Sequence, residues 1–166
     1  MQGDYFSSDT QEFLVLLNKY EVKYLIVGGE AVIYYGYARL TGDVDFFYDI
    51  SEENVQKLYQ VLDEFWGGNI PGIENVSELS KPGLIFLFGI PPHRIDLINT
   101  IQNVSFPQAW LSKTIDYITI NKQKISIYFI GLDDLIKNKE SLNRPKDLED
   151  LKYLKKIKEK SSEKFL

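Results

Sequence analysis

Two acidic residues at the start of an apolar strand, Asp43 and Asp45, constrain the fold of this chain more than any other feature of its sequence. They flank Val44 and lead into Phe46-Phe47-Tyr48, a run typical of a buried strand. Because side chains alternate along a strand, both carboxylates lie on one face, roughly 7 Å apart. Such a pair beside buried aromatic residues is costly unless a cation lies between them. The pattern favours Mg²⁺, and two solvent-facing aspartates on a half-exposed strand are the alternative.

A pair of glycines and a third acid extend this pattern. The apolar run 23–27 predicts a strand that ends at Gly28-Gly29, and thirteen residues separate Gly29 from Asp43. Glycine lets the backbone approach a ligand closely, so this turn is a candidate phosphate site. The third acid, Asp96, lies in an apolar strand and shares a face with Arg94. The alternative for Asp96 is a salt-bridged strand residue.

The remaining hydrophobic patterns predict a mixed sheet with helices packed on it. Helices are expected at 10–20, 31–38, 51–65 and from Asp133-Asp134 and Pro145, and strands at 23–27, 44–48, 84–90, 94–99, 115–120 and 124–130. Successive strands followed by helices are typical of an α+β fold rather than of a doubly wound parallel sheet. We expect one domain at 1–166, with a core at 22–130 and a helical C-terminal part at 131–166.

The composition and the apolar runs indicate in which cellular environment the chain is expected. Its 166 residues include no cysteine, which excludes disulfides and thiolate metal sites and suits the cytoplasm. The N-terminal stretch does not resemble a signal peptide, and Leu84–Phe88, the longest apolar run, is too short for a bilayer. We therefore expect a soluble cytoplasmic protein without a membrane partner.

The charge is distributed unevenly. The net charge of −5 argues against a broad surface for nucleic acid, yet ten of the 19 Lys and Arg residues lie within 137–166. This stretch is either a solvated helix or a basic wall that faces an anionic ligand.

Several blocks of the sequence resemble a known superfamily. Tyr24-Leu-Ile-Val-Gly-Gly-Glu-Ala-Val and Tyr35-Gly-Tyr-Ala-Arg-Leu-Thr-Gly-Asp-Val-Asp resemble the core of DNA polymerase β-type nucleotidyltransferases. The most similar members are small bacterial and archaeal proteins related to AbiEii-type toxins. Arg94-Ile-Asp-Leu resembles their third-carboxylate strand. Two further blocks, Asp134-Leu-Ile-Lys-Asn-Lys and Arg144-Pro-Lys-Asp-Leu-Glu-Asp-Leu, resemble their C-terminal helical motif, so the resemblance covers most of the chain.

The resemblance implies a metal-dependent nucleotidyltransferase that moves a nucleoside monophosphate from an NTP to a hydroxyl group. Asp43, Asp45 and Asp96 would be the catalytic residues and would hold two Mg²⁺ ions, for which Mn²⁺ is a substitute. Asp96 would also accept the hydroxyl proton. Lys139 is the first choice for a phosphate clamp. The full set of expected nucleotide-binding residues is Gly28, Gly29, Arg39, Thr41, Lys139, Arg144 and Lys146.

Some features agree instead with an alternative to an enzyme, a module that binds a ligand but catalyses no reaction. Gly29 stands where many members of the superfamily have serine, and Glu30 adds a negative charge near the expected phosphates. Arg39 and Thr41 either contact phosphate or orient their loop. Such a module would bind metal or nucleotide without turnover, or would form part of a toxin–antitoxin pair.

The acceptor and the partners stay open at this stage. A protein side chain, an RNA 3′ end and a small molecule are all compatible with the sequence. About 36 residues follow Ile130, enough for two helices, so we expect an open cleft or a site completed by a homodimer or a hetero-partner. The single histidine, His93, lies in the Pro91-Pro92 turn and is expected at the surface.

Overall fold

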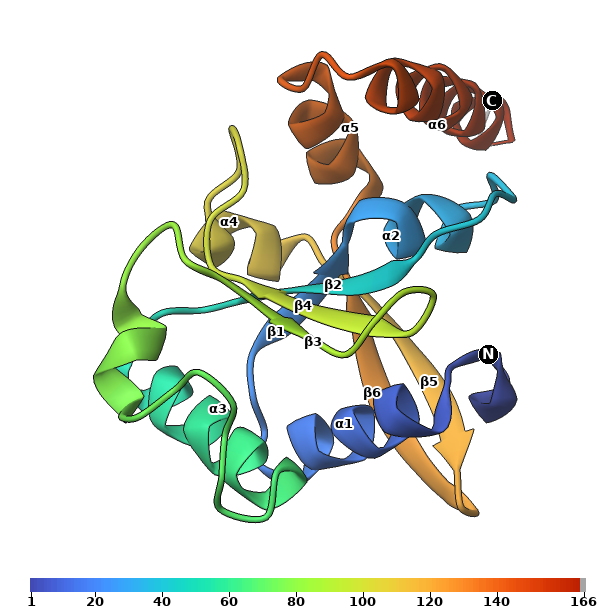
Figure 1. Ribbon diagram of the computed structural model, residues 1–166. Coiled ribbons are helices and arrows are strands. Elements are labelled where there is room, and N and C mark those ends of the chain that lie inside the picture. Colours follow the sequence, from blue (N-terminus) through green and yellow to red (C-terminus); the bar gives the residue numbers. More distant parts are fainter. Residues whose placement is uncertain (165–166) are drawn as a thin grey trace.

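The computed structural model describes residues 1–164, whose strands form one sheet (Figure 1). The strands are β1 (Tyr24–Val27), β2 (Asp43–Tyr48), β3 (Ile85–Phe88), β4 (Arg94–Ile98), β5 (Thr114–Ile120) and β6 (Gln123–Phe129). They lie in the order β3-β4-β2-β1-β6-β5. The β2–β4 and β1–β6 pairs are parallel, whereas the β1–β2, β3–β4 and β5–β6 pairs are antiparallel. The sheet is therefore mixed, as the sequence predicts.

Helices cover both faces of this sheet (Figure 1). They are α1 (Ser8–Lys19), α2 (Gly28–Tyr34), α3 (Glu52–Phe65), α4 (Phe106–Leu111), α5 (Leu132–Glu140) and α6 (Pro145–Glu163). α1 and α3 share a core with Phe46, whereas α2, α4 and α5 share a second core with Phe47. Because these neighbours in β2 point to opposite faces, the centre of the strand is buried on both sides. The α+β class is confirmed.

Serine side chains cap the N-termini of α1 and α3, the two helices that share a core with Phe46. Ser7 accepts a hydrogen bond from the backbone N–H of Thr10, and Ser51 accepts one from that of Asn54. Each cap satisfies a backbone donor that has no partner inside its helix. The cap at Ser51 agrees with the start of the helix expected at 51–65, and α1 begins at Ser8, two residues before its expected start, because Ser7 supplies the cap.

Helix α2 differs most from its expected bounds. It begins directly after β1, where Gly28 has a φ of 65°, and it ends before Gly36, where φ is 121°. Glycine adopts both values without the strain that a Cβ atom would add. The helix therefore spans the residues between these two turns rather than 31–38.

Three short elements were not predicted. They are α4 and the 3₁₀ turns Gly3–Tyr5 and Val76–Ser80, each too short to show a helical period. A usable signal for α4 was the proline at its second residue, Pro107, because proline is favoured in the first turn of a helix.

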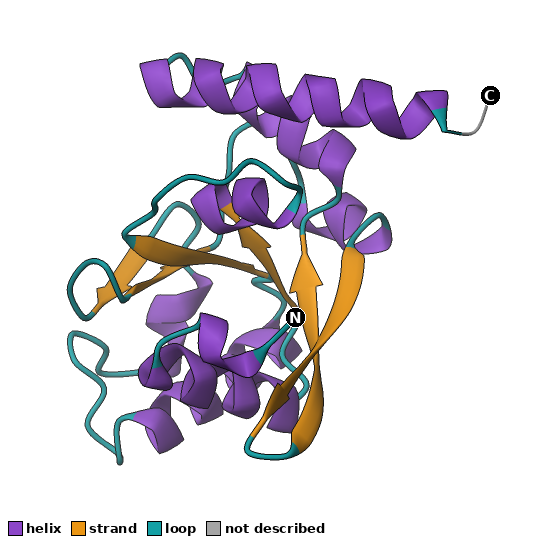
Figure 2. Cartoon of the chain, turned by 90° about the vertical axis from the view of Figure 1, so that its right-hand side faces the viewer, coloured by secondary structure: helices purple, strands orange, loops and turns teal. Residues whose placement is uncertain are grey.

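The C-terminal part consists of α5 and α6, and α6 lies on the side of α5 away from the sheet (Figure 2). Asp133 and Asp134 occupy the first turn of α5, and Pro145 begins α6, as predicted. None of the helices within residues 1–164 combines the length and the apolar character needed to cross a membrane.

Candidate metal and nucleotide site

Asp43, Asp45 and Asp96 come together at one end of the sheet. Strands β2 and β4 are adjacent and parallel, and their register places Asp45 opposite Asp96. One carboxylate oxygen from each of the three side chains lies within 4.8 Å of the other two. Carboxylate oxygens are the ligands that Mg²⁺ and similar hard cations prefer. The donor set therefore fits a divalent cation.

Arg94 lies between two of these acids. Its Nε and Nη2 atoms donate to Asp96 Oδ1 and Oδ2 at 2.7 and 2.8 Å, and Nη2 also donates to Asp43 Oδ2 at 2.9 Å. The guanidinium thus fills a position that attracts positive charge, which is a second indication that a cation fits here. Alternation along β4 predicts that Arg94 and Asp96 share a face. The contact with Asp43 depends on the register between strands, which the sequence does not display.

Burial and mutual repulsion raise the pKa of two of the acids. Burial is the largest cause for Asp45, followed by the charges of Asp43 and Asp96, and its pKa rises to about 7. Burial and the neighbouring Asp96 also raise the pKa of Asp43, and Arg94 opposes this shift. A bound cation would remove the repulsion, because it favours the charged form of each carboxyl.

Gly28 and Gly29 lie against these acids. A Cβ atom on Gly28 would collide with the carboxylate of Asp45, and one on Gly29 would lie 2.7 Å from Thr41 Oγ1. The Thr41 hydroxyl in turn donates to Asp43 Oδ1 at 3.3 Å. Glycine is needed because the backbone approaches these side chains so closely. The structure thus brings three of the predicted nucleotide-binding residues next to the acids.

Lys139 lies in the interior rather than beside the three acids. Its side chain is 3% exposed, and its Nζ atom lies 3.0 Å from both Asp147 Oδ1 and Asp150 Oδ2. A contact between Lys139 and a phosphate would require both ion pairs to break. The burial and pairing of Lys139 do not favour the expected phosphate clamp, which stays a prediction, because a buried ammonium needs its carboxylate partners.

Arg39 belongs to the same buried network. Its Nε and Nη2 atoms donate to the two carboxylate oxygens of Asp150 at 2.8 and 2.9 Å. The loop before β2 is thereby fixed to α6. Of the two roles expected for Arg39, this geometry agrees with the orientation of its loop.

Arg144 and Lys146 are exposed at the start of α6. The pKa of Arg144 is raised mainly by its hydrogen bond to Asp147, and the charge of Asp45 contributes to the shift. The charge of Lys146 lowers the pKa of Asp45, against the larger effect of burial. Both basic side chains therefore interact electrostatically with Asp45.

A comparison with models of protein families shows the family to which this chain belongs. Residues 6–164 match the model of a family described as nucleotidyltransferase of unknown function (DUF6036). The chain belongs to this family. No curated protein matched the sequence. The resemblance to small nucleotidyltransferases is thus confirmed, and the relation to AbiEii-type toxins stays a prediction.

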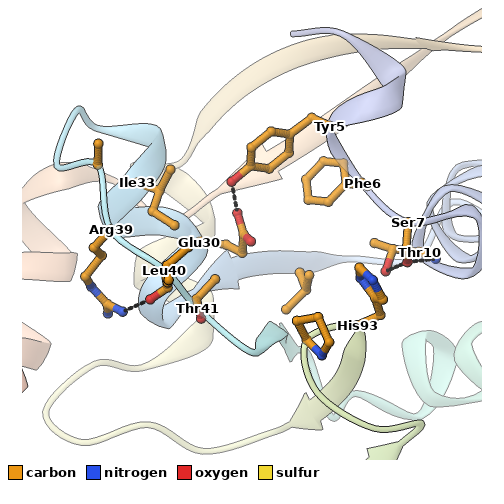
Figure 3. A pocket seen from close by; sticks show the side chains of 13 residues that line it. Tyr5, Phe6, Ser7, Thr10, Glu30, Ile33, Arg39, Leu40, Thr41 and His93 are labelled. Carbon is orange, nitrogen blue, oxygen red and sulfur yellow. Dashed lines mark hydrogen bonds between the residues drawn. The ribbon is translucent and has the colours of Figure 1, made fainter.

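A cavity of about 380 Å³ adjoins this candidate site (Figure 3). Thr41 and Val44, which flank the first acid, belong to its lining. Glu30 also lines it and accepts a hydrogen bond of 2.8 Å from the Tyr5 hydroxyl. The Glu30 carboxylate thus contacts the N-terminal segment, and burial raises its pKa. The exposed His93 lies at the same cavity, and neither this cavity nor the contact with Tyr5 was predicted.

Proposed function

We propose that this chain transfers a nucleoside monophosphate from an NTP to a hydroxyl group of an acceptor. The observation that carries the proposal is the convergence of Asp43, Asp45 and Asp96 in a member of a nucleotidyltransferase family. We assign Mg²⁺ to these three side chains, with Mn²⁺ as a substitute. When bound, the metal would neutralise the triphosphate and lower the pKa of the acceptor hydroxyl.

The chemical step is a displacement at the α-phosphorus. The acceptor oxygen forms a bond to this phosphorus, the bond to the oxygen that bridges to the β-phosphate breaks, and pyrophosphate leaves with the electron pair. The hydroxyl proton passes to Asp96, directly or through water. Arg94 orients the Asp96 carboxylate through two hydrogen bonds, which leave further lone pairs on its oxygens to accept the proton.

Exposed basic residues at the start of α6 are our first choice for the groups that bind the triphosphate. Lys146 and Arg144 interact electrostatically with Asp45 and are free of the burial that restrains Lys139. Their positive charge would stabilise the leaving pyrophosphate. Lys139 acts indirectly in this proposal, since it holds the start of α6 in place.

The loops around β1 and β2 complete the proposed nucleotide site. The backbone N–H groups of Gly28 and Gly29 remain our candidates for the β- and γ-phosphates. Thr41 orients the carboxylate of Asp43 through its hydrogen bond, and Arg39 fixes the loop that carries Thr41. Thr41 and Arg39 thus position the acids rather than bind substrate.

A module that binds without turnover is the second candidate. The observation that favours it is Arg94, which pairs with both Asp43 and Asp96 at the position expected for a cation. Such a module would bind a nucleotide or serve as one component of a toxin–antitoxin pair.

Transfer of label from α-³²P-labelled NTPs separates the two candidates. The purified chain is incubated with Mg²⁺, each NTP and protein, RNA and small-molecule fractions of a cell extract. If the chain is an enzyme, we expect metal-dependent labelling that is lost in the Asp43→Ala/Asp45→Ala variant. The labelling should be retained in Asp63→Ala, a control on the exposed surface of α3. Binding of NTP without label transfer to any fraction would support the module instead.

A further inference from the structure

The cavity beside the three acids has a mixed chemical lining. Tyr5, Phe6 and Ile33 supply apolar surface, and Glu30 supplies a carboxylate (Figure 3). At about 380 Å³, the cavity is within the size range of small-molecule sites. Pockets of this kind combine apolar walls, which supply affinity, with a few polar groups, which fix the orientation of the ligand.

The charge of the cavity favours a ligand that carries a positive charge. Among the ion pairs of residues 1–164, none involves Glu30, whose carboxylate accepts a hydrogen bond from the neutral Tyr5 hydroxyl. The one arginine of the lining, Arg39, is paired with Asp150 and directs its guanidinium away from Tyr5 and Phe6 (Figure 3). A cationic amine would therefore complete the environment of Glu30, whereas an anion would be repelled.

The position of the cavity connects it to the transfer reaction. Thr41 lines the cavity and also donates a hydrogen bond to Asp43. Val44, another lining residue, lies between Asp43 and Asp45 in β2, and its side chain points to the face opposite the two acids, so the cavity approaches them only at the start of the strand, beside Thr41. A ligand held at Glu30 thus lies next to the strand that carries two of the three acids.

We propose that this cavity binds the acceptor, and that the acceptor is a small hydroxylated amine. Its apolar part packs between Tyr5, Phe6 and Ile33, its ammonium group pairs with Glu30, and its hydroxyl group faces the acids past Thr41. The inference rests on the proposed nucleotidyl transfer, and it selects the small molecule among the three classes of acceptor that the sequence leaves open.

The test compares three probes that share a phenyl ring and a hydroxyl group. 2-Amino-1-phenylethanol is the cationic probe, 1-phenylethane-1,2-diol is neutral, and mandelate is anionic. Each is titrated into the isotope-labelled full chain, without metal or nucleotide, while the methyl signals of Ile33 are followed by NMR. We expect the amine to bind about tenfold more tightly than the diol, and mandelate to bind most weakly.

Two variants show whether Glu30 is responsible. Glu30→Gln should remove the preference for the amine, whereas Glu53→Gln, whose side chain is 82% exposed on α3, should leave it unchanged. Tyr5→Phe keeps the carboxylate and should keep the preference. If Tyr5→Phe loses the preference for the amine as completely as Glu30→Gln does, the loss reflects a change in the shape of the cavity, and recognition of charge by Glu30 is refuted.

The remaining outcomes decide the proposal separately from the transfer reaction. Equal binding of the amine and the diol, or shifts at signals remote from Ile33, would overturn the assignment of an amine site. The Asp43→Ala/Asp45→Ala variant should still bind the amine, because these acids are not its partners. If the amine binds and no NTP label is ever transferred, the amine site stands and the transferase proposal fails.

Discussion

Gly28 is the residue with the least room for a side chain in the candidate site, because its backbone lies against the Asp45 carboxylate. Gly67 provides a matched control, with a φ of 61° against 65° for Gly28 and no atom within 4 Å of the position that a Cβ would take. Gly67→Ala should cost roughly 1–2 kcal/mol for the left-handed backbone alone. Gly28→Ala should cost more and should also weaken Mn²⁺ binding, because Asp45 must move.

Denaturant unfolding and Mn²⁺ titration of both variants check this prediction. Equal Mn²⁺ affinities in Gly28→Ala and Gly67→Ala would show that the contact between Gly28 and Asp45 does not shape the metal site.

Arg94 competes with a divalent cation for the same carboxylates. In Arg94→Gln, Asp43 and Asp96 lose their positive partner, so we expect Mn²⁺ to bind at least about tenfold more tightly. The metal-free variant should be less stable than the wild type, and Mn²⁺ should restore much of the loss. Calorimetric titration measures the affinity, and Lys57→Gln on α3 is the control. Weaker Mn²⁺ binding in Arg94→Gln would mean that the guanidinium supports the metal site.

Asp45 makes metal binding depend on pH. Its pKa of about 7 in the folded chain means that a proton occupies the carboxyl below this pH and must leave when a cation binds. We expect the Mn²⁺ affinity to fall about tenfold for each pH unit below this pKa, and to change little above it. Titrations one unit below and one unit above the pKa measure the difference, and equal affinities would contradict the assignment of Asp45 as a ligand.

The raised pKa of Asp45 makes the stability of the metal-free chain fall as the pH rises, whereas the affinity for metal rises. The folded state holds this proton more tightly than the unfolded state, in which the carboxyl titrates near its ordinary value of 3.8. The stabilising contribution is therefore complete below about pH 4 and is lost as the pH rises through about 7. Asp45→Asn should remove this part of the pH dependence, which thermal unfolding across that range will reveal.

At the scale of elements, the junction of α5 and α6 depends on one buried lysine. Lys139→Met leaves Asp147 and Asp150 buried without the ammonium that joins them, so we expect a loss of roughly 3–5 kcal/mol in the free energy of unfolding. Lys158→Met removes an exposed pair with Asp133 and should cost less than about 1 kcal/mol. Similar losses in both variants, measured by denaturant unfolding, would refute the structural role of Lys139.

The elements that the sequence predicts well are those with a clear period or a cap. The bounds of β2 and α3 follow from an apolar run and from the N-cap Ser51, because both signals are local. Short α4 has no period, and its start is marked only by a proline. Local signals thus account for most of the sheet and for the long helices.

The site is less accessible to sequence reasoning than the fold. Alternation places Asp43 and Asp45 on one face, and the apolar strand around Asp96 marks a third acid, whose role beside the other two only the family resemblance implies. The burial of Lys139 could not be predicted, because its partners Asp147 and Asp150 lie on the next helix and the surrounding sequence is rich in lysine. The contact of Glu30 with Tyr5 joins segments 25 residues apart, and no local pattern marks it.

At the scale of the molecule, the fold brings a basic helix start to an acidic strand pair. Arg144 and Lys146 of α6 lie near Asp45 of β2, although about 100 residues separate them in the sequence. The basic wall that faces an anionic ligand stays a prediction, and so does its alternative, a solvated helix. The expectations of one domain and of a homodimer or hetero-partner stay predictions, as does the location in the cytoplasm.

The position of a bound metal tests the central claim most directly. Crystals of the chain with Mn²⁺ and a non-hydrolysable NTP analogue would reveal the metal by its anomalous scattering. We predict a peak about 2.1 Å from carboxylate oxygens of Asp43 and Asp45, with the triphosphate between Gly28 and the start of α6. A triphosphate bound elsewhere, or no metal at these acids while Arg94 still bridges them, would contradict the account.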